Sequence, residues 1–373
     1  MRVISIVGAR PQFIKLKPVH DALLAKGHEH MVIHTGQHYD PEMSGDMFAD
    51  MELPEPDICL GIGPGEPTQQ VARMVEALES QISRVSPDSV LVYGDTTTTL
   101  AGAIAASKLE VKTGHVEAGL RSYDPRMIEE VSRRIADRVC HLLFAPTANA
   151  VANLAKEGLG ANARLTGDVM LDAFLAFSPR ASAMGFHKEV GVEKPYILAT
   201  LHRAENVDQP ETLKSILENL KMVSKIMPVV FPIHPRTLKR VGEYGLEDYL
   251  AKRATSDVER KRILNERQAT IEVIPPVGYL RNLSLLLDCE LVITDSGGLQ
   301  KEALFAGKPC ITLRDRTEWP ETLKEGANRL IPGARGLEDA ARFIIENPPA
   351  APGPGAFGDG NAGRLIAEAT GEA

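Results

Sequence analysis

Short apolar runs alternate with helical patterns along nearly the whole chain, and this alternation constrains the fold more than any other feature. Strands that alternate with helices form parallel sheets, because each parallel neighbour must be reached by a crossover connection. The first series of predicted strands comprises Val3–Val7, Met31–Thr35, Val90–Tyr93, Lys112–Val116, Leu142–Ala145 and Ala163–Leu165. After an irregular stretch near Phe177–Pro195, the second series comprises Tyr196–Thr200, Val229–Ile233, Ile271–Ile274, Leu291–Thr294 and Cys310–Leu313.

Two such series predict an α/β protein with two doubly wound, Rossmann-like domains facing a cleft. We expect the first domain at residues 1–180 and the second at residues 190–350. The Pro-, Gly- and Ala-rich segment Pro348 to Gly360 is typical of a linker, and a last helix within residues 361–373 is expected to pack back on the first domain. A length of 373 residues agrees with two domains, because single cores rarely exceed about 250–300 residues.

The composition restricts the class of partner. A formal net charge of −8 and the lack of a basic run argue against nucleic-acid binding. No apolar segment approaches the roughly 20 residues that span a bilayer, and Met1–Val7 is typical of a first strand rather than of a signal peptide. The four cysteines (Cys59, Cys140, Cys289 and Cys310) have no C-x-x-C spacing, which favours free thiols in a reducing cytoplasm over disulfides or a zinc site.

The stretch Asp288–Arg316 contains the strongest binding signal. Its predicted strand Leu291–Thr294 is followed by Asp295-Ser296-Gly297-Gly298 and then by a helical pattern. Glycines at a helix start let a ligand approach the backbone, and the unpaired N–H groups there attract phosphate. Glu302, about one turn into the helix, could accept both hydroxyls of a ribose. The alternative is an ordinary strand-to-helix turn.

Polar residues also follow most of the other predicted strands. Because ligands bind beyond the carboxyl ends of strands in such sheets, these residues predict an anion-binding, carboxylate-rich site. They are Arg10 and Lys15 after the first strand, Asp95 after the third, Glu117 after the fourth with Glu129 and Glu130 downstream, and His202, Arg203, His234 and Arg236 in the second half.

Two common nucleotide-binding motifs are missing from the sequence. No G-x-x-x-x-G-K-[ST] occurs, and the first strand is followed by Gly8 alone rather than by G-x-G-x-x-G. Gly61-Ile62-Gly63-Pro64-Gly65 is glycine-rich but does not join a first strand to a helix. The sequence therefore predicts neither a P-loop nucleotidase nor an NAD cofactor, and no His, Asp or Glu spacing requires a metal.

Taken together and in order, five short motifs resemble those of the non-hydrolysing UDP-N-acetylglucosamine 2-epimerases. They are Gly8–Lys15, Thr35-Gly36-Gln37-His38, Gly94-Asp95-Thr96-Thr97, His115–Arg121 and Thr294–Gly298. The resemblance implies a glycosyltransferase-B architecture, a UDP-sugar substrate and typically a homodimer. It further implies interconversion of UDP-GlcNAc and UDP-ManNAc for surface polysaccharide precursors, without NAD or an obligatory metal.

Several residues depart from the commonest pattern of that family. Gln12 stands where Glu is usual, and Trp319 stands where many relatives have Arg; Ile128, Ser132 and Asn282 also differ. Several of these variants resemble the branch that acts on UDP-2,3-diacetamido-2,3-dideoxy-glucuronic acid. The substituents at C3 and C6 of the sugar are therefore left open, whereas the reaction type is not.

The resemblance also implies roles for individual residues. Asp95, Glu117, Glu129 and His202 are the expected catalytic residues. Arg10, Lys15, Val277, Ser296, Gly297, Gly298 and Glu302 are the expected substrate-binding residues. In some bacterial relatives, positions resembling Gln37, Arg73, Arg203 and His234 hold a second UDP-GlcNAc as an activator, although Asp40 stands where those relatives can have Gln.

Inversion at C2 of a UDP-sugar explains why carboxylates are needed. No carbonyl neighbours C2 to acidify its proton. One route would first oxidise C3 with NAD, and the missing dinucleotide fingerprint argues against it. The other route eliminates UDP, and the breaking C1–O bond then generates the positive charge that makes the C2 proton removable. A glycal-type intermediate results, and UDP adds back while C2 is reprotonated from the opposite face. Such a reaction needs a base and an acid on opposite faces, a cradle that retains UDP, and exclusion of water.

Each candidate residue also has a purely structural alternative. Asp95 could cap a turn or helix, Glu129 or Glu130 could complement the dipole of its helix, and His202 could bond to backbone. Arg10 and Lys15 could lie on a solvated helix face, and Arg73 and His234 could be surface and core residues.

Three other functions remain open from the sequence. They are a glycosyltransferase of the same architecture, a hydrolysing relative that releases free ManNAc and UDP, and a UDP-sugar-binding regulator. The glycosyltransferase would share the nucleotide-binding half but would not need Asp95, Glu117 and Glu129 together. A leakier cleft would permit hydrolysis, and the retained carboxylates argue against a regulator.

Overall fold

The computed structural model describes residues 1–37, 48, 50–63, 65–250, 271–350 and 353–372. The chain divides into two compact units, each described here by itself. Unit 1 comprises Met1–Ala176 and Pro354–Ala373, and unit 2 comprises Phe177–Gly353. Among the described residues, no helix has the length and apolar character needed to cross a membrane.

Unit 1 contains a fully parallel sheet with the strand order β3-β2-β1-β4-β5-β6-β7. Its central strands β1 and β4 are almost entirely buried because helices cover both faces, which is why they read as continuous apolar runs. The strands are β1 (Arg2–Val7), β2 (Glu29–His34), β3 (Ile58–Cys59), β4 (Ser89–Tyr93), β5 (Lys112–Val116), β6 (Leu142–Ala145) and β7 (Ala163–Leu165).

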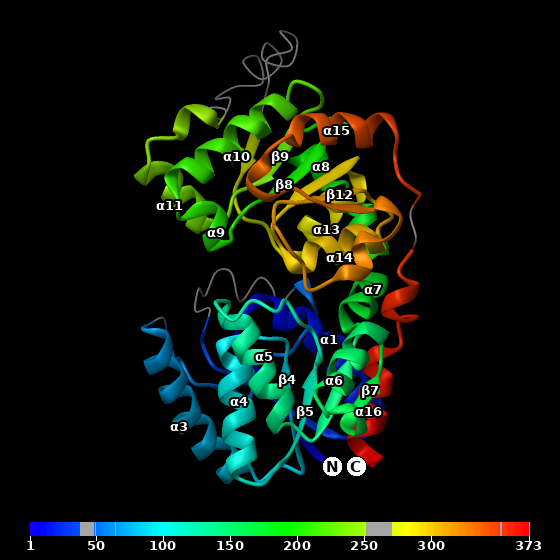
Figure 1. Cartoon of the computed structure of the whole chain (residues 1–373). Helices are drawn as coiled ribbons and strands as arrows, with labels where there is room; N and C mark the ends of the chain where they lie inside the picture. Colours follow the sequence, from blue (N-terminus) through cyan, green and yellow to red (C-terminus); the bar gives the residue numbers. More distant parts are fainter. Residues whose placement is uncertain (38–47, 49, 64, 251–270, 351–352, 373) are drawn as a thin grey trace. The chain divides into compact units, whose positions relative to one another are not determined.

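The helices of unit 1 form two groups. Helices α3, α4 and α5 pack in series, whereas α1 packs against the C-terminal helix α16 (Figure 1). Lys26 of the loop after α1 and Glu368 of α16 form an ion pair of 2.9 Å. The helices are α1 (Arg10–Ala25), α3 (Pro67–Val85), α4 (Thr97–Lys108), α5 (Ile128–Val139), α6 (Ala148–Lys156), α16 (Ala362–Glu372) and the short η1 (Gly160–Asn162) and η5 (Gly355–Phe357).

Unit 2 contains a second parallel sheet, with the strand order β10-β9-β8-β11-β12-β13. Apolar residues of its strands and of α10 and α15 form one core. The strands are β8 (Ile197–Thr200), β9 (Val229–Pro232), β10 (Ile271–Ile274), β11 (Leu291–Thr294), β12 (Cys310–Thr312) and β13 (Asn328–Leu330).

The helices of unit 2 follow its strands along the chain, and α7 (Val169–Met184) runs from unit 1 into unit 2. The others are α8 (Phe186–Glu189), α9 (Ala204–Val207), α10 (Pro210–Val223), α11 (Pro235–Glu243), α13 (Tyr279–Asp288), α14 (Gly297–Phe305), α15 (Leu337–Glu346), η2 (Glu247–Tyr249), η3 (Pro320–Gly326) and η4 (Pro332–Ala334).

The predicted α/β class with two parallel sheets is confirmed, and the structure adds two strands that the sequence did not reveal. β3 and β13 are short edge strands, too brief to show any apolar periodicity. The expected linker before the last helix is also more than a linker, because Phe357 is fully buried and its carbonyl accepts a hydrogen bond of 2.8 Å from the Asp168 amide.

Candidate functional site

The strand order reverses at one point in each sheet, between β1 and β4 in unit 1 and between β8 and β11 in unit 2. At such a switch point the loops that follow the two strands diverge to opposite faces and leave room for a ligand beyond the carboxyl ends. Gly8 and Asp95 follow β1 and β4, and His202 and Ser296 follow β8 and β11. The sequence-predicted residues thus concentrate at the two switch points.

In unit 1, Lys15 of α1 and Glu117 after β5 form a buried ion pair. The Lys15 Nζ and Glu117 Oε1 atoms lie 2.5 Å apart, and the side chains are 7% and 5% exposed. Burial therefore rules out a solvated helix face for Lys15. Glu117 has a φ of +74°, a left-handed conformation that non-glycine residues adopt rarely and mostly at functional sites.

Gly94 makes this pair sterically possible. Its φ is +63°, and a Cβ at this position would lie 2.9 Å from Lys15 Nζ and 3.4 Å from Glu117 Oε1. Any side chain here would press on the charged pair in addition to straining the backbone. Asp95 is the residue that follows Gly94 in the chain.

Asp95 forms an ion pair with Arg133 of α5. The Arg133 side chain is 2% exposed, and its guanidinium also lies 3.5 Å from the Glu130 carboxylate. Thr96, not Asp95, caps α4 by accepting a hydrogen bond from the Thr99 amide, so the alternative of Asp95 as a helix cap is wrong. Arg133 was missed by the sequence reasoning, although an arginine three residues after Glu130 falls on the same helical face.

The structure gives Glu129 and Glu130 different environments in the first turn of α5. Glu130 is buried and accepts hydrogen bonds of 2.8 and 2.9 Å from the amide and hydroxyl of Ser122. It therefore holds the preceding loop in place. Glu129 remains half-buried.

Two glutamines tie the strand ends of unit 1 together. The Gln12 side chain accepts hydrogen bonds from the Gly8 and Ala9 amides, at 2.8 and 3.0 Å, and donates to the Tyr93 carbonyl at 2.8 Å. Gln37 accepts hydrogen bonds from the amide and hydroxyl of Thr98. Burial lowers the pKa of Arg10, and the nearby Asp50 charge opposes that shift.

In unit 2, the buried carboxylate of Asp295 organises the other switch point. It accepts hydrogen bonds from the amides of His202 and Arg203 and from the Asn206 side chain. Burial would raise the pKa of Asp295, but the hydrogen bond and charge of His202 together with the other donors lower it to about 2. His202 Nδ1 lies 3.0 Å from Asp295 Oδ1, so the His202 ring is oriented by a carboxylate rather than by backbone.

Helix α14 begins directly after Asp295, and its start carries a cluster of opposite charges. The Ser296 hydroxyl caps the helix by accepting from the Leu299 amide at 3.4 Å. A Cβ at Gly297 would lie 2.4 Å from Glu318 Oε1, so a side chain here would displace this carboxylate. Glu318 pairs with Arg314 at 2.8 Å and lies 3.7 Å from Arg203.

Within α14, Glu302 is buried, with 5% of its surface exposed. Burial and the neighbouring Glu302 carboxylate raise the pKa of Tyr279 well above its usual value. Val277 is half-buried in the loop before α13, and Gly298 is the second residue of α14.

The four residues expected to hold an activator fall into both units. His234 caps α11 through its Nδ1, and its ring centroid lies 5.5 Å from that of His202. His234 is exposed, so its alternative as a core residue is wrong; Arg73 is exposed on α3. Gln37 and Arg203 make the contacts given above. His38 and Asp40 lie outside the described residues.

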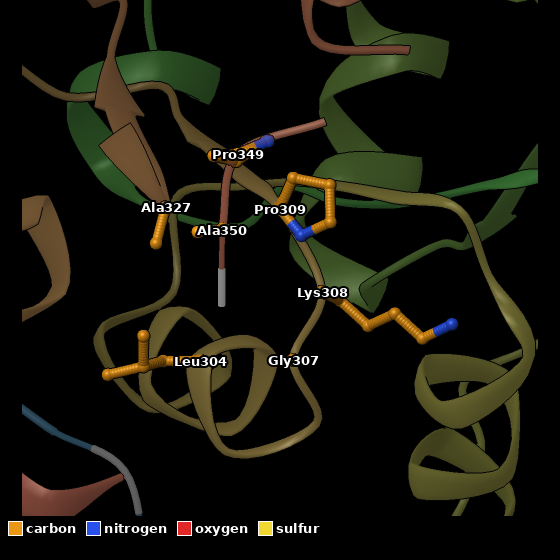
Figure 2. A pocket seen from close by; sticks show the side chains of 7 residues that line it. All are labelled: Leu304, Gly307, Lys308, Pro309, Ala327, Pro349 and Ala350. Atoms are coloured by element: carbon orange, nitrogen blue, oxygen red, sulfur yellow. The ribbon is translucent and has the colours of Figure 1, made fainter. Parts of the chain in front are cut away.

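Across the described ranges, no three His, Cys, Asp or Glu side chains come together as a metal-binding group. Unit 2 has a shallow recess with room for about one water molecule (Figure 2). The residues that line it are Leu304, Gly307, Lys308, Pro309, Ala327, Pro349 and Ala350. It lies at the C-terminal end of α14, away from the Ser296 end, and has no part in the candidate site.

Comparison with known proteins gives consistent matches over the whole chain. The model of the family described as UDP-N-acetylglucosamine 2-epimerase matches residues 21–371. The UDP-2,3-diacetamido-2,3-dideoxy-D-glucuronate 2-epimerase of Pseudomonas aeruginosa is 44% identical over 343 residues, which is 90% of each chain. The UDP-N-acetylglucosamine 2-epimerase of Methanocaldococcus jannaschii is 41% identical over 338 residues, 89% of this chain and 88% of that one.

Solved structures give the same result. The crystal structure of the Methanocaldococcus jannaschii UDP-GlcNAc 2-epimerase in complex with UDP-GlcNAc and UDP superposes with a TM-score of 0.89 at 38% identity, covering 100% of both chains. The Neisseria meningitidis UDP-GlcNAc 2-epimerase bound to UDP-GlcNAc superposes with a TM-score of 0.85 at 28% identity, also over 100% of both chains.

Proposed function

This chain belongs to the UDP-N-acetylglucosamine 2-epimerase family, and we propose that it interconverts UDP-GlcNAc and UDP-ManNAc by inverting C2 of the sugar. The observation that carries the proposal is the set of charged side chains at the carboxyl ends of β4 and β5. There Glu117 is paired with Lys15, and Asp95 is paired with Arg133. Such an arrangement supplies oriented carboxylates for proton transfer at carbon.

The reaction begins with loss of UDP. The C1–O bond breaks with its electron pair on the departing diphosphate, a carboxylate removes the C2 proton, and a C1=C2 double bond forms. In the reverse step UDP adds to C1 while a proton is delivered to the opposite face of C2. Asp95, Glu117 and Glu129 are the proposed proton-transfer groups, and Lys15 and Arg133 hold two of them in position.

Unit 2 is proposed to retain the diphosphate between the two steps. The N-terminal amides of α14 at Ser296–Gly298 are donors for phosphate oxygens, and His202, oriented by Asp295, is a further donor. Glu302 and Val277 are proposed contacts of the nucleoside, and Arg10 of unit 1 is a proposed contact of the phosphates. This division of labour needs neither NAD nor a metal.

The proposal is tested by incubating the protein with UDP-GlcNAc in D₂O without any acceptor. Deuterium at C2, together with UDP-ManNAc and intact UDP-sugar, is the expected result. Glu117→Gln is the matched variant, and it should lower the exchange rate by about 10²–10⁴-fold. Free UDP with free ManNAc would instead indicate a hydrolase. Absence of deuterium from UDP-GlcNAc, and also from the UDP-diacetamido uronate considered next, would contradict epimerisation.

The diacetamido uronate is the second candidate substrate, because the Pseudomonas aeruginosa relative that acts on it is 44% identical. It differs from UDP-GlcNAc at C3 and C6 and would need the same C2 chemistry. Comparing kcat/KM for the two UDP-sugars in the same exchange assay decides between them. A ratio near one would mean that neither substituent is recognised.

We also propose that the protein is a homodimer. Ile128, Val131 and Ile135 of α5 are 57%, 44% and 37% exposed, and their spacing places them on one face of the helix. Light scattering should give twice the 40.5 kDa chain mass. Val131→Glu with Ile135→Glu should yield monomers, whereas Leu238→Glu on α11 should not; a monomeric wild-type protein at micromolar concentration would refute the proposal.

A cytoplasmic role in supplying surface polysaccharide precursors is proposed with the function. The four free cysteines support a reducing compartment. Activation by a second UDP-GlcNAc through Gln37, Arg73, Arg203 and His234 is proposed as well. If so, Arg73→Ala should make the dependence of rate on UDP-GlcNAc less cooperative, while an already hyperbolic wild-type curve would rule activation out.

A further inference from the structure

His115 is a fully buried histidine whose two ring nitrogens both face hydrogen-bond acceptors. Nδ1 lies 2.7 Å from Asp137 Oδ1, and Nε2 lies 2.6 Å from the carbonyl oxygen of Gly94. The side chains of His115 and Asp137 are both 0% exposed. His115 belongs to the motif His115–Arg121, yet the proposed reaction gives it no task.

The identity of the two acceptors determines what the ring must do. A backbone carbonyl can only accept, and an ionised carboxylate can only accept as well. Burial would raise the pKa of Asp137, but the hydrogen bond and charge of His115 and those of Arg121 lower it. Both ring nitrogens must therefore donate, and only the imidazolium form of histidine has two N–H donors.

The charge of such an imidazolium is balanced within a chain of alternating charges that runs from the buried His115 to the partly exposed Glu157. Asp137 also accepts from Arg121 at 2.7 Å and from the Gly119 amide at 3.2 Å. Arg121 in turn donates to both oxygens of Glu157, at 2.8 and 2.9 Å. The cations His115 and Arg121 thus alternate with the carboxylates of Asp137 and Glu157. The charge of the His115 donor is therefore balanced, and the four groups together carry no net charge.

This donor acts on the residue at the centre of the candidate site. The Gly94 amide donates to the Val116 carbonyl at 2.9 Å, and the Gly94 carbonyl accepts from His115. Both peptide groups that flank Gly94 are thus tied to β5. The Lys15–Glu117 pair packs against the Gly94 Cα, and Asp95 is the next residue.

We propose that His115 is a positively charged positioning residue, which fixes Gly94 through its Nε2–H and thereby holds the Asp95 and Glu117 carboxylates in register. It contacts neither carboxylate itself. The role of His115 in catalysis rests on the proposed epimerisation, whereas the proposed positive charge of its ring does not depend on that function. The two parts of the proposal can therefore be tested separately.

The charge state is tested by nitrogen NMR of protein labelled at its histidines. We expect both ring nitrogens of His115 to show one-bond coupling to a proton in the folded protein, because both face hydrogen-bond acceptors. The His115→Gln spectrum identifies the signal by its loss. A nitrogen without coupling would mean a neutral ring and a protonated Asp137, and would overturn the proposal whatever the enzyme's activity.

The positioning role is tested by kinetics in the C2 exchange assay. His115→Gln should lower kcat about 10²-fold while KM changes less than about threefold, because misplaced catalytic groups affect the reacting geometry more than binding. His141→Gln is the matched control. His141 is exposed, and its ring accepts from the Thr113 amide at 3.1 Å near the opposite end of β5, so that variant should keep full activity.

A double variant separates positioning from simple stability. His115→Gln alone leaves the buried Asp137 with one cation fewer, and adding Asp137→Asn removes that imbalance. The double variant should therefore regain thermal stability but not kcat. Recovery of kcat together with stability, or full kcat in the single variant, would show that His115 serves only the fold. Absence of C2 exchange in the wild-type protein would refute the proposed function and leave the NMR result standing.

Discussion

Units 1 and 2 carry polar groups at equivalent points of similar parallel sheets, but the kinds of polar group differ. Unit 1 places pairs of charged side chains there, the buried pair Lys15 with Glu117 and the partly buried pair Asp95 with Arg133. Unit 2 places a helix start there, with Asp295 buried behind it as an acceptor of backbone and side-chain donors. Paired side chains can move protons, whereas backbone donors can only bind, and this difference supports the proposed roles of unit 1 in proton transfer and of unit 2 in anion retention.

The largest expected effect comes from breaking the charge pair of unit 1. Lys15→Met leaves the Glu117 carboxylate buried without its closest cation and should lower the free energy of unfolding by about 3–5 kcal/mol. The double variant Lys15→Met with Glu117→Gln should recover part of that loss. Urea unfolding measures both.

Lys17→Met is the control on the same helix. Lys17 pairs with the largely exposed Asp21, so its loss should cost at most about 1 kcal/mol. Equal losses of stability for Lys15→Met and Lys17→Met would mean that the buried Lys15–Glu117 pair stabilises the fold no more than a surface pair does. The proposed difference between the two units would then lose its support.

The second prediction tests the buried acceptor of unit 2 through pH. The pKa of Asp295 is about 2 in the folded protein, below its usual value near 3.8, so its contribution to stability is present above about pH 4 and lost as pH falls towards 2. The shift corresponds to about 2 kcal/mol. Asp295→Asn should destabilise the protein at pH 6 by roughly this amount.

The difference between wild type and Asp295→Asn should then shrink as the pH is lowered from about 4 towards 2. Asp315→Asn serves as control, because Asp315 is largely exposed. A difference that is the same at every pH would show that Asp295 acts by shape rather than by charge.

The third prediction concerns a neutral histidine pair in unit 1. His20 Nδ1 and His30 Nδ1 lie 2.8 Å apart, and His30 Nε2 lies 2.8 Å from the Ser5 hydroxyl. Burial lowers the pKa of both rings, and the neighbouring His20 helps to lower that of His30 to about 3. Because the unfolded state binds protons from about pH 6.5 downwards, folded stability should fall as pH drops below that value.

For His30 alone, the loss at pH 5 should be about 1–2 kcal/mol. His30→Gln should flatten the stability profile between about pH 6.5 and pH 5, whereas His28→Gln, at a half-buried position outside this pair, should not. Parallel profiles for wild type and His30→Gln would exclude the pair as the origin of acid sensitivity.

The smallest effect is expected at the start of α14. Ser296→Ala removes the side-chain cap and should cost about 1 kcal/mol of stability. It should also weaken UDP binding, measured by calorimetry, without changing the C2 exchange rate at saturating substrate. A lower exchange rate at saturation would mean that unit 2 takes part in the chemistry as well as in binding.

Most strands of the two sheets were predictable, because parallel strands that are buried on both faces tend to have apolar sequences. Buried on both faces, Leu291–Thr294 reads as a compact, mostly apolar run with a sharp end, and the structure keeps this strand and Lys112–Val116 at the predicted bounds. Their ends locate Glu117 and Ser296 without further information. The short edge strands β3 and β13 escaped because two or three residues carry no periodicity.

Side-chain partners were much harder to predict than positions. Glu117 and Lys15 are 102 residues apart, and Asp95 and Arg133 are 38 apart. Neither pairing leaves a local pattern, so Lys15 was expected only as a substrate contact and Arg133 was overlooked. Likewise, the sequence did not distinguish Glu130 from Glu129. The hydrogen bonds from Ser122 to the Glu130 carboxylate make the difference, and they depend on the tertiary structure.

By itself, the sequence determined the α/β class, the two series of strands and the residues at the strand ends, since each depends on contacts between near neighbours in the chain. Only the tertiary structure decided which charges meet, that Gly94 must lack a side chain, and that His115 faces an acceptor on both sides. Those outcomes depend on the register between β1, β4 and β5, where displacement by one residue would turn every side chain to the opposite face.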